Sequence, residues 1–95
     1  MDMIAMLEAL KVDLGISTTA YDARLTQYLQ AAGEAIKTGG ITLDLQDYQD
    51  TMLQIMYAAW LWRKRDSQES MPRMLRWLMN NRLFSEKVKE QGSTM

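Results

Sequence analysis

The stretch Met52–Trp62 constrains this fold more than any other part of the sequence. It holds eleven residues, all apolar apart from Gln54, and it lies between an acidic segment and a basic one. Drawn as a helix, it is apolar on nearly every side, so other elements have to enclose it. At about half the length of a membrane-spanning helix, it does not predict a membrane protein. We therefore expect a buried helix at the centre of a soluble domain.

Helical periodicity continues through the rest of the chain, and no segment alternates as a β-strand does. A first helix is predicted over residues 2–14, with Gly15 as its stop. A second is predicted from Thr18 or Thr19 to Gly39-Gly40, and Thr19 with Asp22 resembles a capping box at its start.

The central helix is predicted over residues 44–65, followed by a polar loop, and a fourth helix from Pro72 to about Phe84. Together these elements predict an all-α fold, a small four-helix bundle with a central buried third helix. Residues 1–84 are expected to form this single helical domain, and residues 85–95 a flexible C-terminal tail because they lose the apolar pattern.

The composition argues against most catalytic chemistry. The 95 residues include no Cys and no His, which excludes Cys nucleophiles, His bases, disulfides and the usual zinc sites. Asp44, Asp47 and Asp50 form the one carboxylate cluster in the sequence, but their spacing does not match a calcium-binding loop, and helix capping explains them. We expect a protein that is not an enzyme, with no catalytic residues, no cofactor and no metal.

Charge is distributed unevenly along the chain. Residues 1–62 hold three basic and eight acidic side chains, a net charge of −5, whereas residues 63–95 hold eight basic and four acidic ones, a net charge of +4. Opposite-signed parts either neutralise each other within a monomer or attract copies of the chain head to tail. The triplet Arg63-Lys64-Arg65 is either a solvated helix end or a phosphate contact.

Three side chains suggest contacts beyond a simple core. Trp60 and Trp62 point to different sides of one helix, so they cannot share a neighbour. We assign Trp60 to the core and Trp62, beside Arg63 and Arg65, to a subunit or partner interface. Arg82 lies inside the apolar arc of the fourth helix, where it either extends to water or binds a specific carboxylate, within the chain or across an interface.

The order of these features resembles one known family. A short first helix with Met6–Ile16 leads into Asp22–Ile36, a buried helix with Met56–Arg63 follows, and Met71-Pro72 opens a segment carrying Leu75, Leu78 and Arg82. Over about residues 5–84 the pattern is similar to the head–tail connector (head-completion, or adaptor) proteins of tailed bacteriophages and prophages. Family members often enter the third helix through Pro and acidic residues, whereas here residues 41–44 lack Pro.

The resemblance implies a homo-oligomeric ring of about twelve copies, seated between the portal protein and a tail-side connector or stopper protein. Packaged DNA would pass through its channel without sequence-specific binding. The protein would occupy the head–tail junction of the virion, and the bacterial cytoplasm before assembly. Two alternatives remain open: a DNA-binding regulator using Arg63–Arg65 with Arg73 and Arg76, and a non-viral helical module that binds a partner helix in an apolar groove.

Overall fold

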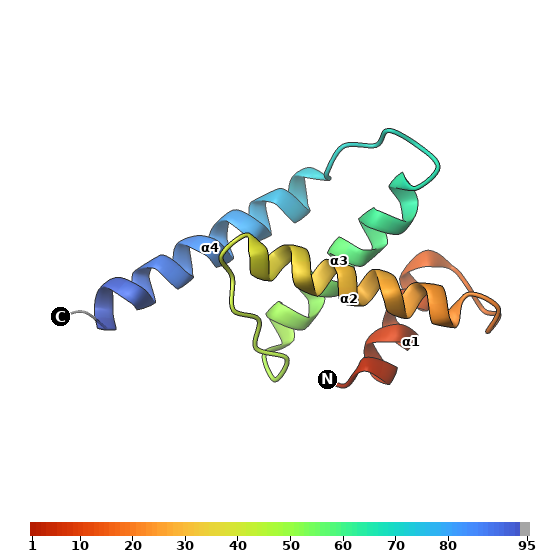
Figure 1. The fold of residues 1–95 in the computed structure, drawn as a ribbon, viewed down its shortest axis with the longest axis horizontal. Coiled ribbons are helices and arrows are strands. Elements are labelled where there is room, and N and C mark those ends of the chain that lie inside the picture. The colour runs from red at the N-terminus through yellow and green to blue at the C-terminus, as the bar shows by residue number, and fades with distance from the viewer. Residues whose placement is uncertain (94–95) are drawn as a thin grey trace.

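The computed structural model describes residues 1–93, with side chains through Lys89. Over this range the protein consists of four α-helices and no strand: α1 (Met3–Leu14), α2 (Asp22–Thr38), α3 (Tyr48–Lys64) and α4 (Arg73–Ser93). The predicted all-α, four-helix fold is confirmed. In Figure 1, α2 crosses α3 near the middle of the molecule, while α4 extends toward one end of the long axis and α1 lies toward the other.

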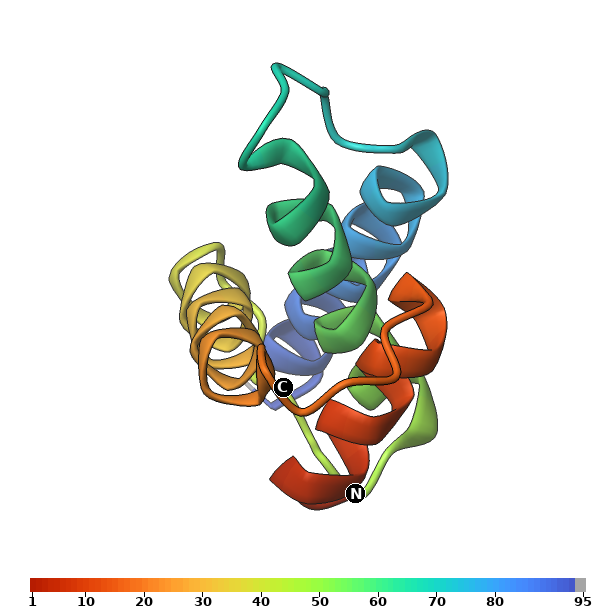
Figure 2. The same cartoon turned by 90° about the vertical axis from the view of Figure 1, so that its right-hand side faces the viewer.

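The third helix is central, as the sequence predicts, because it is covered on two sides. One side belongs to a first core cluster that α3 shares with α1 and α2, made of Met6, Leu10, Leu25, Leu29, Ala32, Ile55, Ala58, Ala59 and Trp62. The other side belongs to a second core cluster, which reaches α4 and consists of Ile36, Ile41, Leu53 and Leu75. Figure 2 shows α3 running between α2, α1 and α4.

The first helix follows its prediction closely. Asp2 caps its start, since the carboxylate accepts a hydrogen bond of 2.8 Å from the amide of Ala5. Gly15 ends it in the left-handed conformation, with φ +72°. Met6 and Leu10 are fully buried on one face, so α1 contributes a single apolar stripe to the first core cluster.

The second helix begins three residues later than the predicted capping box, and that prediction is wrong. No side chain caps α2, and the Thr18 hydroxyl instead accepts from the amide of Ala20 within a turn. Asp22 is 2.9 Å from the ammonium of Lys11, a largely buried cation on α1. Because a buried charge needs a partner, Asp22 joins α1 to α2 instead of serving a cap.

A close approach of α2 to α3 depends on Gly33. The buried side chain of Gln54 lies against this glycine and donates a 2.9 Å hydrogen bond to the carbonyl of Leu29. A Cβ atom at position 33 would lie 2.9 Å from the Gln54 amide nitrogen. The one polar residue of the central apolar stretch is thus satisfied by the backbone of the neighbouring helix.

The fourth helix is longer than predicted. It continues to Ser93 through most of the segment that we expected to be a tail, so the predicted end at Phe84 is wrong. The segment lacks an apolar pattern, but it is rich in Glu and Lys, which favour helices. Glu86 also pairs with Arg82 one turn before it, at 2.8 Å. Residues 94 and 95, the end of that predicted tail, lie outside the described residues.

Candidate functional site

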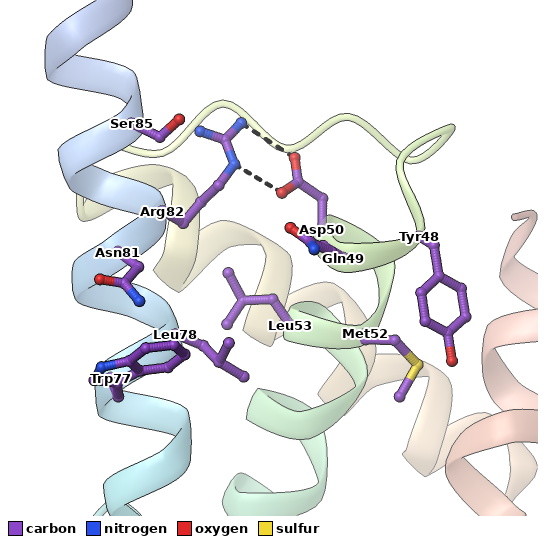
Figure 3. A pocket seen from close by; sticks show the side chains of 10 residues that line it. All are labelled: Tyr48, Gln49, Asp50, Met52, Leu53, Trp77, Leu78, Asn81, Arg82 and Ser85. Carbon is purple, nitrogen blue, oxygen red and sulfur yellow. Dashed lines mark hydrogen bonds and ion pairs between the residues drawn. The ribbon is translucent and has the colours of Figure 1, made fainter.

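A groove of about 410 Å³ separates the first half of α3 from the middle of α4. Leu53 on α3 and Leu78 on α4 form its apolar floor, where the two side chains point toward one another (Figure 3). The exposed rings of Tyr48 and Trp77 belong to its two walls. The complete lining is Tyr48, Gln49, Asp50, Met52, Leu53, Trp77, Leu78, Asn81, Arg82 and Ser85.

An ion pair between Asp50 and Arg82 closes one end of this groove (Figure 3). Arg82 donates from Nε to one Asp50 oxygen at 2.7 Å and from Nη2 to the other at 3.1 Å, so the contact is bidentate. The same Nη2 donates to the carbonyl of Thr42 at 2.7 Å. The sequence left three possibilities for Arg82: extension to water, a carboxylate partner within the chain, or one across an interface. The structure confirms the partner within the chain, Asp50.

The protonation equilibria of both partners respond to this contact. Burial by itself would raise the pKa of Asp50, whose residue is only 2% exposed. Hydrogen bonds from Arg82 and from the amide of Asp44, together with the Arg82 charge, outweigh burial and hold the pKa of Asp50 below its ordinary value. The hydrogen bond to Asp50 raises the pKa of Arg82 despite its burial. Both groups are charged at neutral pH.

The three aspartates around the start of α3 have separate structural roles. Asp44 accepts from the amide of Gln46 at 2.9 Å, and Asp47 caps α3 by accepting from the amide of Gln49 at 2.8 Å. Asp50 holds Arg82. Helix α3 accordingly starts at Tyr48 and not near Asp44. Within the part of the chain that the structure describes, no group of three acidic side chains is arranged to hold a metal ion.

The assignment of Trp62 to an interface is wrong, and Trp60, assigned to the core, does pack against a core cluster but is only partly buried. Trp62 is 9% exposed and belongs to the first core cluster, with Tyr21 and Tyr28 packed edge-on at 5.6 and 5.5 Å. Trp60 is half-buried beside the second core cluster and packs against Tyr57. Ile55, Ala59 and Trp62 share one helical face, so Trp62 continues the buried stripe that faces α1 and α2.

The predicted interface residues do not form one surface. Arg65 stacks over the Trp62 ring, 3.6 Å from its centroid, and lies 3.6 Å from Asp66. Arg63 is exposed and 3.9 Å from Asp13 on α1. These side chains lie at the C-terminal end of α3, whereas Arg82 pairs with Asp50 near its N-terminal end. Arg65 covers the ring of a core residue of its own monomer, and Arg63 lies near a carboxylate of α1.

A different surface emerges on the outward side of α4. Met74, Trp77, Phe84 and Val88 are 60%, 61%, 70% and 49% exposed, and we call this set the α4 stripe. The apolar arc of the fourth helix in the sequence consists of Met74, Leu75, Leu78, Met79 and Leu83, and of these Met74 is left exposed, beside Trp77, for which the sequence predicts no role. The signal was present in the spacing, since steps of three and four residues recur from Met74 through Asn81 to Val88. Trp77 belongs to both this stripe and the lining of the groove, so the two apolar features adjoin.

Comparisons with protein-family models, with curated proteins and with solved structures find no match to this chain. The likeness to phage connectors therefore stands on the sequence features given above. Among the described helices, none combines the length and the hydropathy that crossing a bilayer requires.

Proposed function

We propose that this protein is a structural, non-enzymatic subunit of a phage head–tail connector, which assembles into a ring between portal and tail. The observation that carries the proposal is the α4 stripe, in which large apolar side chains remain in water. Contiguous apolar patches on a folded domain usually mark a contact surface. Trp and Phe are effective anchors at such surfaces because they bury a large area with few rotatable bonds.

Three further features support this proposal. The order of helices resembles that of connector proteins over most of the chain. An exposed acidic side chain on α1, Glu8, and exposed basic ones on α4, Arg73 and Arg76, give a subunit two unlike surfaces, which a closed ring requires. The carboxylate of the groove, Asp50, has a structural role, since it binds Arg82 and the amide of Asp44.

The proposal assigns four partners. Neighbouring copies complete the ring, the portal protein and a tail-side connector or stopper contact its two faces, and packaged DNA passes through the channel. The protein would therefore reside at the head–tail junction of the virion and, before assembly, in the bacterial cytoplasm.

The rival function, DNA binding by a small regulator, depends on cations that are partly engaged elsewhere. Arg65 covers Trp62, and the ammonium of Lys64 lies 4.5 Å from the centroid of the Trp60 ring. Arg73 and Arg76 are exposed on α4. A regulator of this kind would bind duplex DNA as a monomer or dimer with an affinity that falls steeply with salt.

Electron microscopy of the purified protein, alone and mixed with the portal protein encoded near its gene, tests the proposal. We expect closed rings in at least the second preparation. Particles that remain monomeric or dimeric in both, or a gene with no portal and capsid genes in its neighbourhood, would refute it. Tight duplex binding by a monomer, measured by fluorescence anisotropy across a salt series, would favour the regulator instead.

A further inference from the structure

The α4 stripe is bordered by positive charge. Arg73, Arg76 and Lys87 are exposed, and on a helix they fall along one edge of the stripe. Among the described side chains of α4, the only carboxylate is that of Glu86, which is 14% exposed and paired with Arg82. A surface that covers the stripe should therefore combine apolar side chains with an acidic one.

The exposed face of α1 has this character. Ile4 and Val12 are 75% and 82% exposed, and Glu8 lies between them, also exposed. Because the three residues are four positions apart, they share one side of the helix, which we call the α1 face. Asp13 follows Val12 in sequence but points to another side of the helix, where its carboxylate lies 3.9 Å from Arg63. The α1 face contributes nothing to the first core cluster.

We propose that the α4 stripe of one copy packs on the α1 face of a second copy. The inference rests on the proposed function, since it specifies the subunit contact of the ring. Charge favours this occupant: the α1 face presents the Glu8 carboxylate to the cationic edge, whereas a second α4 would present arginine and lysine again.

The dimensions and positions of the two surfaces agree with this pairing. Helix α1 has 12 residues and is about 18 Å long, and Met74 to Val88 spans about 21 Å along α4. The two helices lie toward opposite ends of the long axis of the molecule (Figure 1). A contact between unlike surfaces of one chain is heterologous, so every subunit keeps one free surface of each kind until a ring closes.

Two exposed substitutions test the contact without disturbing the core. Trp77→Glu places a carboxylate on the α4 stripe, and Val12→Lys places a cation on the α1 face. We expect each variant to keep the far-ultraviolet circular dichroism of the wild type and to weaken self-association at least about tenfold in sedimentation equilibrium. Gln30→Lys, on an exposed position of α2, is the matched control and should associate like the wild type.

Mixing the two variants gives the decisive result. Trp77→Glu keeps an intact α1 face and Val12→Lys keeps an intact α4 stripe, so an equimolar mixture should form a heterodimer and nothing larger. The inference is overturned if the mixture stays monomeric, if either variant associates normally, or if wild-type protein shows no self-association. Rings that persist in both variants would overturn the contact but leave the proposed function standing. If the two variants form heterodimers but the wild type never closes into rings, the contact would stand and the proposed function would fall.

Discussion

Replacing Arg82 with alanine should remove about 3 kcal/mol from the free energy of unfolding. The change leaves the Asp50 carboxylate buried, with the amide of Asp44 as its remaining hydrogen-bond donor. Breaking a buried ion pair from one side typically costs about 3–5 kcal/mol. The lower end applies here because the Arg82 side chain is 16% exposed and the adjoining groove admits water to the vacated site.

Urea denaturation followed by circular dichroism measures this loss. For a domain of this size, about 3 kcal/mol corresponds to a fall of about 12–24 °C in Tm. Arg76→Ala, an exposed position on the same helix, is the control and should change stability by no more than about 0.5 kcal/mol. If Arg82→Ala comes within about 1 kcal/mol of Arg76→Ala, the bidentate contact does not hold α4 to α3 and the reasoning fails.

Three other perturbations follow from the same structure. Because folding lowers the pKa of Asp50, the ionised carboxylate should stabilise the fold above about pH 4, and this contribution should disappear as the pH falls through the folded-state pKa. The difference in urea midpoint between the wild type and Asp50→Asn should therefore vanish in acid. Trp62→Ala should lower the free energy of unfolding by about 3–5 kcal/mol in urea denaturation, and Trp60→Ala clearly less, since only Trp62 belongs to the first core cluster; the opposite ranking would show that Trp60 is the main core tryptophan. Gly33→Ala should destabilise the fold by about 1 kcal/mol, because the new methyl group displaces the Gln54 side chain. In a Gln54→Ala variant the same change should stabilise the fold, since only the higher helix propensity of alanine then acts. Destabilisation in both cases would show that backbone packing is responsible.

The helices could be predicted because their signals are local. Asp2 and Gly15 mark the two ends of α1 in both the sequence and the structure. The central position of the third helix could be predicted because its apolar stretch is too uniform to leave a solvent-exposed polar face. The extension of α4 could not be predicted in this way. A helical segment that packs against no other element needs no apolar stripe. The loss of apolar periodicity beyond Phe84 therefore does not show where the helix ends.

The functional residues were harder to predict because they depend on which helices meet. Uniform apolarity made α3 recognisable as central, but it also concealed which tryptophan faces α1 and α2 and which faces α4. The position of Arg82 showed that it needed an explanation, yet its partner lies 32 residues away and only the packing of α4 on α3 identifies Asp50. The α4 stripe had a visible spacing, but helical periodicity cannot say which apolar face a neighbour covers.

The division into two core clusters has a consequence for motion. The first core cluster and the apolar residues packed on it include none of the α4 side chains that the structure describes, so α1, α2 and α3 can keep that core while α4 opens. Such regions behave as separate cooperative units in native-state hydrogen exchange. Amides of α4 should then exchange at a lower free energy than those of α3. A neighbouring subunit bound to α4 would raise the free energy of opening of this helix by mass action. Assembly should therefore be measurable as slower amide exchange, mainly in α4.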